Sequence, residues 1–173
     1  MTKPTRLYTG RIITLDVEQV TLPNGANARF EIVGHPGGAA VVPVDDRGRV
    51  CMVRQYRHVT GGWLWEVPAG KLDGREPIDT AINELAEEAG LVAGHLEPLG
   101  PMWASPGIFT EIVHLFLATD LHAVTARPEY DEVIEVHWMP MQTAIAAALD
   151  GSFCDAKTVI AILRAAHHLG FSR

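Results

Sequence analysis

The feature that most constrains this chain is a short predicted helix that carries three carboxylates near its C-terminal end. Pro77 suits the first helical position and Gly90 suits the left-handed residue that often follows a helix, so we expect the helix to start at Pro77 and end before Gly90. Glu84, Glu87 and Glu88 share one face, where like charges meet close to the negative end of the helix dipole. The aliphatic residues that share another face, and that we expect to face the core, are Ile78, Ala81, Ile82, Leu85 and Ala89.

This acidic face has two explanations. One is that the carboxylates are solvated, which is the common case for a charged helix face. The other is that they bind a divalent cation, because residues 77–89 contain no Lys or Arg that would offset the repulsion. Carboxylate oxygens are hard ligands that suit Mg²⁺ or Mn²⁺. The glycine-containing loop that precedes the helix favours the second explanation.

The composition limits the class of protein and its partners. The chain has 173 residues, of which 47% are hydrophobic, and this is enough for one domain with a proper core. A net charge of −7 argues against a nucleic-acid partner, and no apolar run approaches the ~18 residues of a membrane span. Cys51 and Cys154 are far apart, and the N-terminus lacks the apolar core of a signal peptide. We therefore expect a cytoplasmic protein without a membrane partner.

Residues 69–91 resemble the box that defines the Nudix family, Gly-x5-Glu-x7-Arg-Glu-U-x-Glu-Glu-x-Gly-U, where U is aliphatic. The residues that match it are Gly70, Glu84, Leu85, Glu87, Glu88, Gly90 and Leu91. There are two departures from the pattern. The stretch between Glu76 and the first catalytic glutamate is one residue short, and Asn83 stands where the family has an arginine.

The resemblance implies an α+β protein, a Nudix-type α/β/α sandwich with a mixed β-sheet and an N-terminal antiparallel β-subdomain. Residues 1–38 would form that subdomain, which in similar enzymes commonly swaps across a homodimer, and residues 39–173 would form the catalytic domain. The cofactor would be Mg²⁺, with Mn²⁺ as the other candidate. The implied metal ligands are the backbone carbonyl of Ala69 and the side chains of Glu84, Glu87 and Glu88.

The remaining elements follow from periodicity and turn signals. Alternation of apolar and polar residues predicts strands within residues 7–33, with a turn at Pro23–Gly25. The further predicted strands are 39–44 and 50–55, which we expect to form a hairpin, then 63–67, 112–118 and 134–139. Two core helices are predicted at 141–149 and 156–169, the second with Asp155 as its N-cap.

Two arginines at the end of the strand 50–55 are candidates for phosphate binding. Arginine pairs with phosphate through two parallel hydrogen bonds, although surface arginines are more often only solvated. In the similar family the arginine of a Gln-x-Arg unit often touches the diphosphate, so Arg57 is the first choice and Arg54 the second. Glu66 matches a family glutamate that lies close to the substrate or the metals.

A Ser-Pro-Gly segment after the box carries the clue to the substrate. Such a segment is a turn by default. Pro106 lies fifteen residues beyond Leu91, and within the Nudix family a proline at about this distance is typical of ADP-ribose pyrophosphatases. Ser105, Pro106 and Glu111 match the Ser-Pro-Gly-x3-Glu segment of those enzymes. Other nucleoside diphosphate sugars stay open as substrates.

The acidic loop 127–133 is a candidate source of the catalytic base. Acidic loops are usually only solvated. In similar enzymes, however, a loop glutamate at this place reaches the metals or serves as general base, and Glu132 aligns best, with Glu129 as the reserve. Together with Glu87, these two residues are the expected catalytic carboxylates.

These observations predict a metal-dependent Nudix pyrophosphohydrolase with a small nucleotide substrate. It would cleave ADP-ribose to AMP and ribose 5-phosphate, or act on a related nucleoside diphosphate sugar. The alternatives are dinucleoside polyphosphates or other dinucleotides as substrates, or a Nudix module that senses a ligand without catalysis. Degenerate modules usually lose the box glutamates, and this chain keeps three.

Overall fold

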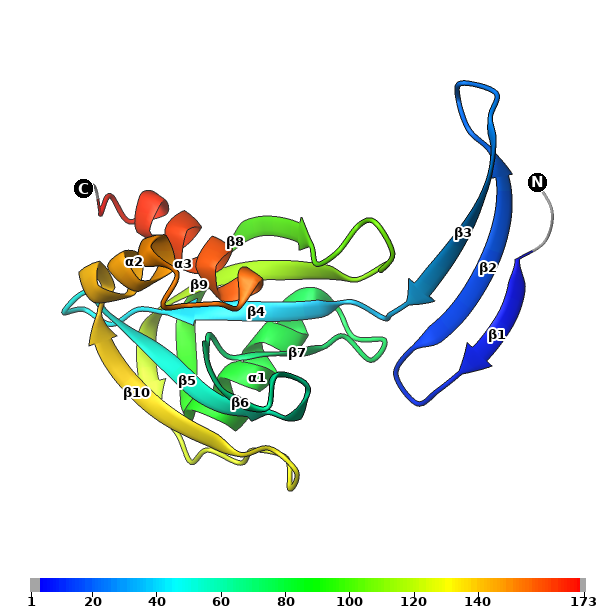
Figure 1. Ribbon diagram of the computed structural model, residues 1–173. Helices are drawn as coiled ribbons and strands as arrows, with labels where there is room; N and C mark the ends of the chain where they lie inside the picture. The colour runs from blue at the N-terminus through cyan, green and yellow to red at the C-terminus, as the bar shows by residue number, and fades with distance from the viewer. Residues whose placement is uncertain (1–3, 172–173) are drawn as a thin grey trace.

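Three helices pack around two sheets, and a third sheet projects from this body (Figure 1). The computed structural model describes residues 4–171. Its elements are β1 (Thr5–Thr9), β2 (Thr14–Thr21), β3 (Asn27–Gly34), β4 (Gly38–Pro43), β5 (Arg49–Arg57), the 3₁₀ turn η1 (His58–Thr60), β6 (Gly62–Glu66), β7 (Ala69–Lys71), α1 (Pro77–Ala89), β8 (Leu91–Trp103), β9 (Ile112–Ala123), β10 (Ile134–Pro140), α2 (Met141–Asp150) and α3 (Ala156–His168). Within residues 4–171, no helix has the length and hydropathy needed to cross a bilayer.

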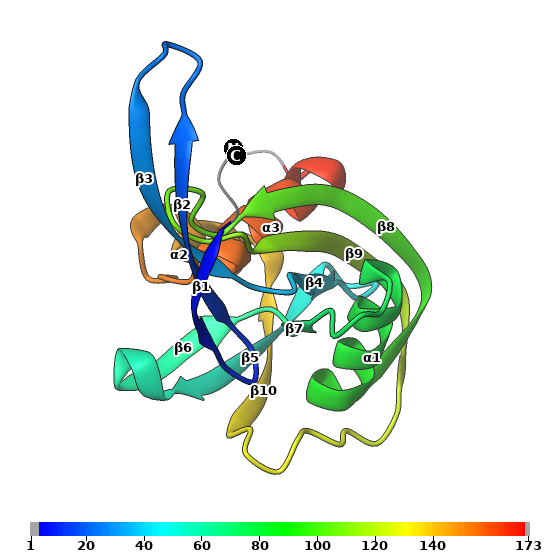
Figure 2. The ribbon, with the colours of Figure 1, turned by 90° about the vertical axis from the view of Figure 1, so that its right-hand side faces the viewer.

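The body has the expected three layers, with α1 on one side of the sheets and α2 and α3 on the other (Figures 1 and 2). One sheet has the strand order β7-β4-β9-β8, in which β4 runs parallel to β9 and the other pairs are antiparallel. The other sheet is antiparallel, with the order β10-β5-β6. The α+β class and the mixed sheet predicted from the sequence are confirmed.

Strand β4 lies between the two hydrophobic cores. All six of its residues are buried, and they alternate between the sides: Val42 contributes to the core under α2 and α3, and Val41 to the core under α1. The predicted hairpin of residues 39–44 and 50–55 is wrong, because the two strands belong to different sheets and share one isolated bridge, Val44 with Val50. The edges of β4 are instead used by β7 and β9.

Helix α1 has the predicted limits, but its buried face is rotated from the predicted one. Leu85 is buried as expected, whereas Ile78 and Ile82 are each 43% exposed. Thr80 and Glu88 are buried in their place. Of the three carboxylates on the acidic face, Glu88 is turned into the protein and is not solvated, whereas Glu84 and Glu87 are half-buried.

Strands β7 and β8 were not predicted. β7 has only three residues, and β8 is interrupted by a bulge between Pro98 and Gly100, so neither shows a clear alternation of apolar and polar residues. β8 and β9 form a long antiparallel hairpin, and its connecting loop carries the Ser-Pro-Gly segment. β7 and β8 are defined by their hydrogen bonds to β4 and β9, which the pattern of apolar and polar residues along the sequence does not show.

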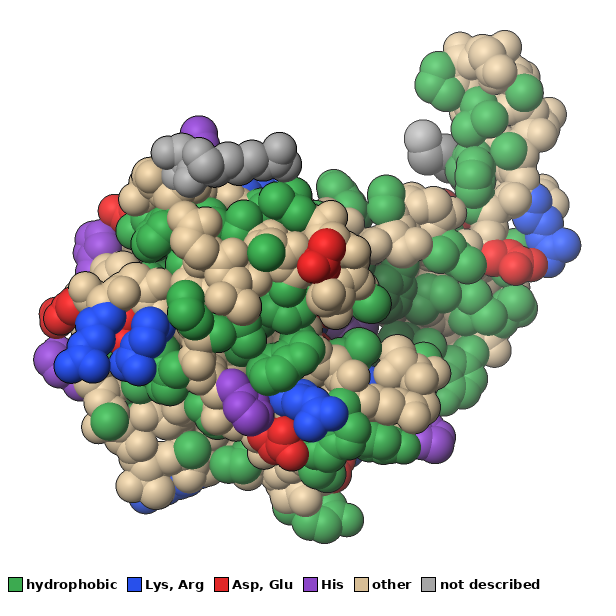
Figure 3. Space-filling model, turned by 60° about the vertical axis from the view of Figure 1, so that its left-hand side comes forward, with side chains coloured by type: hydrophobic (Ala, Val, Ile, Leu, Met, Phe, Trp, Pro, Cys, Tyr) green, Lys and Arg blue, Asp and Glu red, His purple; other side chains and the backbone are tan. Residues whose placement is uncertain are grey.

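The N-terminal strands form a separate antiparallel sheet, β1-β2-β3, which we call the arm (Figure 1). The predicted turn at its β2–β3 hairpin is confirmed, with Gly25 at φ 83°. The arm meets the body at Val33, whose N–H donates to the carbonyl of Ile108 (2.8 Å) and whose carbonyl accepts from Thr110 (3.0 Å). Figure 3 shows the arm as a narrow projection with many apolar side chains on its surface.

The rotation of α1 predicts unequal costs for two truncations on the same helix. Leu85→Ala should lower the free energy of unfolding by about 2–5 kcal/mol, because it opens a cavity at a site that is 1% exposed. Ile82→Ala is the matched control, and it should cost well under half as much because that side chain is 43% exposed. Urea denaturation measures both. Equal losses would mean that both residues face the core, as the sequence pattern alone suggests.

Candidate active site

The loop between β7 and α1 closes with a tight turn and has the family's spacing from Gly70 to Glu76, so the missing residue falls in α1, between Glu76 and Glu84. Asp73 (φ 46°) and Gly74 (φ 82°) are both left-handed, and the N–H of Arg75 donates to the carbonyl of Leu72 (2.8 Å). This is a two-residue turn of the kind that suits Asp-Gly. It carries the chain directly from β7 to Pro77, so the loop sets α1 against β7.

Glu84 approaches Gly70 so closely that a side chain at position 70 would displace the Glu84 carboxylate. The Glu84 carboxylate lies against the backbone of Gly70, and a Cβ at this position would overlap its Oε1. Burial raises the pKa of Glu84 to about 7, and the charges of Glu87, Glu132 and Glu129 add to this shift. The box glutamates and the loop glutamates therefore act on one another electrostatically.

Glu88 is the most deeply buried of the box glutamates, at 2% exposure. Its Oε2 accepts a hydrogen bond from the N–H of Ala69 (2.9 Å), while its Oε1 has no hydrogen-bond partner within residues 4–171. The pKa of Glu88 is raised to about 8. Burial is the main cause, the Ala69 N–H opposes it, and the charges of Glu84 and Glu132 add to it. A buried carboxylate oxygen without a partner is costly, and a cation would satisfy it.

A cavity of about 530 Å³ separates α1 from the loop before β10 and brings most of the predicted carboxylates together. The predicted catalytic and metal residues that line it are Glu84, Glu87, Glu129, Glu132 and Ala69. The N–H of Glu129 donates to Oε2 of Glu132 (2.8 Å), which orders this part of the loop. We call this space the acidic cavity.

The acidic cavity fits a divalent metal by its chemistry. Its oxygen donors suit hard cations, and the unpaired Oε1 of Glu88, on the same helix as Glu84 and Glu87, is an acceptor that a cation would satisfy. Within residues 4–171, no three acidic, histidine or cysteine side chains converge tightly enough to hold an ion as they lie. Mutual repulsion explains this spread, and side-chain rotation would be needed to bring the glutamates onto one ion.

Arg57 lies at the cationic side of the site and is held by Glu66. Its Nε and Nη2 donate to the two carboxylate oxygens of Glu66 (2.7 and 2.8 Å). Glu66 is 1% exposed, and Lys157 Nζ donates to its Oε2 as well (2.5 Å). Burial by itself would raise the pKa of Glu66, but the hydrogen bonds from Arg57 and the charge of Lys157 outweigh it and hold the pKa below its usual value.

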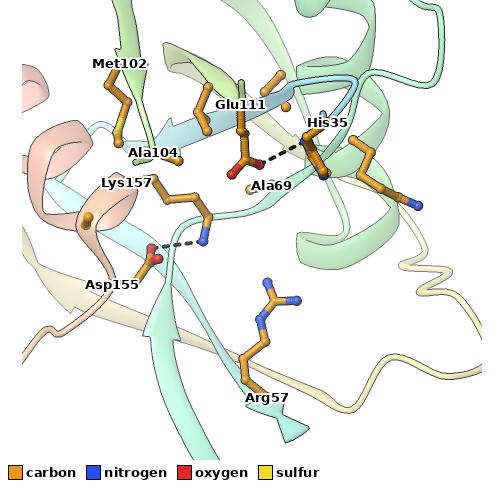
Figure 4. Close-up of a pocket in the computed structure, with 14 residues that line it drawn as sticks. His35, Arg57, Ala69, Met102, Ala104, Glu111, Asp155 and Lys157 are labelled. Atoms are coloured by element: carbon orange, nitrogen blue, oxygen red, sulfur yellow. Dashed lines mark hydrogen bonds and ion pairs between the residues drawn. The ribbon is translucent and has the colours of Figure 1, made fainter. Parts of the chain in front are cut away.

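A second cavity, of about 290 Å³, opens next to the acidic one (Figure 4). Arg57, Ala69, Gly70 and Lys71 line both cavities and so form their boundary. The second cavity is further lined by polar residues from distant parts of the chain, namely His35, Glu111, Asp155 and Lys157. Glu111 faces His35, with Oε1 at 3.4 Å from Nδ1. A ligand with a central group and two substituents could place the central group at Arg57 and one substituent in each cavity.

Four predicted substrate residues line neither cavity, namely Arg54, Glu66, Ser105 and Pro106, and the predicted metal ligand Glu88 lines neither of them. Glu66 lies behind Arg57 and holds it. Arg54 forms an ion pair with Glu135 (3.3 Å) and its guanidinium lies over the ring of Trp63. Ser105 and Pro106 are exposed in the β8–β9 loop, next to Ala104, which does line the second cavity. The structure therefore places Arg57, rather than Arg54, at the boundary of the two cavities.

The lining residues that sequence reasoning missed include Arg11, His35, Asp155 and Lys157. Asp155 was recognised only as the N-cap of α3, and it does accept from the Thr158 N–H (3.0 Å). Lys157 is 91 residues away from Glu66, so only the fold brings the two together. The sequence carried no signal for the other two.

The comparisons with known proteins agree with this geometry. The family model of the NUDIX domain matches residues 34–160, and the chain belongs to the Nudix family. Members of this family generally need divalent metal ions.

Individual relatives extend over nearly the whole chain. An ADP-ribose pyrophosphatase of Bacillus subtilis is 41% identical over 160 residues, which cover 91% of this chain and 86% of the relative. A methanol dehydrogenase activator of Bacillus methanolicus is 36% identical, with 92% and 88% covered. The crystal structure of an ADP compounds hydrolase superposes with a TM-score of 0.80 at 22% identity, covers 99% and 96% of the two chains, and shows the shared fold.

Replacing Glu88 should separate stability from activity. Glu88→Gln keeps an oxygen for the Ala69 N–H but removes the buried charge. The pKa of Glu88 is about 8 in the folded state, above its ordinary value of 4.5. Between pH 4.5 and pH 8 the folded state therefore binds a proton that the unfolded state has lost. The metal-free wild type loses stability as the pH rises through this range. In EDTA at pH 8 the variant should have the higher Tm, yet with metal its turnover should fall by orders of magnitude.

The control for that experiment is Glu76→Gln, which removes an exposed charge just before α1. Its Tm in EDTA should stay near that of wild type. Wild-type turnover by Glu88→Gln at the same metal concentration would show that Glu88 holds no metal.

Proposed function

We propose that this chain is a divalent-metal-dependent hydrolase that cleaves the diphosphate of ADP-ribose to AMP and ribose 5-phosphate, or the diphosphate of a related nucleoside diphosphate sugar. The observation that carries the proposal is the boundary between the cavities, where Arg57 stands across from the glutamates of α1. A diphosphate placed there would have its two substituents in the two cavities. The relative named ADP-ribose pyrophosphatase supports this choice of substrate.

The cofactor we propose is Mg²⁺, with Mn²⁺ as a substitute. Glu84, Glu87, Glu88 and the carbonyl of Ala69 would hold it, since all four belong to one wall formed by α1 and β7. A metal at this place screens the negative charge of the phosphates and lowers the pKa of a bound water.

The remaining roles fall to residues around the acidic cavity. Arg57 and Lys71 are the cations at the boundary, and they neutralise the charge that develops on the phosphate oxygens when the bond breaks. Glu132 is the candidate that orients or deprotonates the attacking water, and Glu129 is held beside it by its hydrogen bond to Glu132. Glu111 would bind a hydroxyl of the substrate in the second cavity.

The substrate prediction is that ADP-ribose has a higher kcat/KM than dinucleoside polyphosphates, nicotinamide dinucleotides or nucleoside triphosphates. The reason is the size of the second cavity, about 290 Å³, together with its polar wall, which suits a sugar phosphate or a nucleoside. Assays of AMP and phosphate products across such a panel decide it. A clear preference for triphosphates would contradict the proposal, and binding without turnover of any compound would indicate a sensing module.

We further propose that the protein is a cytoplasmic homodimer. Residues 1–38 form an N-terminal subdomain whose arm packs on a partner subunit, and residues 39–173 form the catalytic domain. Residues 1–3 and 172–173 lie outside the described part of this division. The arm supports the proposal because it leaves apolar side chains in water that a partner could cover: Leu7, Tyr8 and Ile12 are 57%, 55% and 42% exposed. The two unpaired cysteines suit a reducing compartment.

Removal of the first 34 residues should abolish dimerisation and weaken substrate binding together. Arg11, at the β1–β2 turn, lines the acidic cavity, so loss of the arm also removes a cation from that cavity. Sedimentation velocity at micromolar concentration should give about twice 18.8 kDa for the whole chain and a monomer for the truncated one. A whole chain that sediments as a monomer would contradict the dimer proposal.

A further inference from the structure

We propose that Lys157 is a positioning residue that fixes Arg57 for diphosphate binding, and that it acts through the Glu66 carboxylate that both cations share. The proposal rests on the proposed function in one respect, namely that Arg57 binds the diphosphate. It assigns a role in that step to the N-terminal turn of α3, a part of the chain that lies outside the box.

The contacts of Lys157 place its ammonium beside the carboxylate that holds Arg57. Its Nζ donates to Oε2 of Glu66 (2.5 Å) and to Oδ2 of Asp155 (2.9 Å), and its side chain is 16% exposed. Figure 4 shows Lys157 and Arg57 approaching the same space from α3 and from β5. Two of the three ammonium hydrogens of Lys157 go to Glu66 and Asp155, and Lys157 also lines the second cavity. A double-mutant cycle with Arg57 therefore distinguishes action through Glu66 from direct contact with the ligand.

Glu66 in turn determines the orientation of Arg57. The guanidinium uses Nε and one N–H of Nη2 on the carboxylate, which leaves Nη1 and the second Nη2 hydrogen for a phosphate. A bidentate pair holds the guanidinium plane only if the carboxylate itself is held. Glu66 is 1% exposed, and besides the two hydrogen bonds from Arg57 it accepts one from Lys157.

Lys157 is anchored by a buried polar network at the start of α3. Asp155 accepts from the N–H and the hydroxyl of Thr158 (3.0 and 2.6 Å) as well as from Lys157. Thr158 Oγ1 also accepts from the N–H of Val67, directly after β6 (3.0 Å). This network fixes the first turn of α3 beside Glu66, so the Lys157 ammonium has a defined place relative to Arg57.

The test is a double-mutant cycle on ligand affinity. The probe is α,β-methylene ADP, a diphosphate that cannot be hydrolysed at that bond, titrated calorimetrically in the presence of Mg²⁺. Lys157→Met should weaken binding by about 10- to 100-fold, the usual range for residues that orient a ligand-binding group. In an Arg57→Ala background, Lys157→Met should cause no further loss, because the residue through which it acts is gone.

The matched control is Thr158→Val, which perturbs the same network without removing a bond to Glu66. It should lower the Tm and weaken binding of the probe clearly less than Lys157→Met does, because Lys157 keeps its hydrogen bonds to Glu66 and Asp155. The proposal is overturned if the losses from Lys157→Met and Arg57→Ala add fully, which indicates direct contact with the ligand. It is equally overturned if Thr158→Val weakens binding as much as Lys157→Met, or if wild type does not bind the probe.

Hydrolysis assays on the same proteins keep the two proposals apart. Non-additive binding losses in a protein that hydrolyses no nucleoside diphosphate sugar would leave the Lys157 proposal standing and refute the proposed activity. Additive losses in an active hydrolase would do the reverse.

Discussion

The structure depends on a buried carboxylate face that α1 turns toward the sheet. Glu88 is almost fully buried and Glu84 lies against Gly70, so the fold disfavours the ionised form of both side chains and raises the pKa of each. Ordinary packing would place aliphatic side chains there, and Ile78 and Ile82 are instead left exposed. The burial of these carboxylates therefore lowers the stability of the metal-free fold at this face.

Much of this arrangement could be predicted from local sequence. The limits of α1 follow from Pro77 and Gly90, whose backbone preferences act within one turn of the helix. The burial of β4 follows from its continuous apolar run. The identity of the acidic helix as part of a Nudix box follows from the fixed spacing of its glutamates, because ligands for one site must share a helix face.

The rest depended on contacts between distant segments. Neighbouring strands with a turn between them suggest a hairpin, but β4 and β5 are separated because β7 and β9 take the edges of β4. The choice of Arg57 over Arg54 is set by Glu66, which reaches only one of them. Lys157 could not be recognised at all, since its role arises where the start of α3 meets β6.

The central claim is that the carboxylates of α1 and the carbonyl of Ala69 hold the metal that cleaves the diphosphate. A crystal grown with Mn²⁺ and α,β-methylene ADP, and measured for the anomalous signal of manganese, tests it directly. We predict anomalous peaks in the acidic cavity, within coordination distance of Glu84, Glu88 and the Ala69 carbonyl. Ordered nucleotide at Arg57 with no manganese beside these three groups would contradict the account.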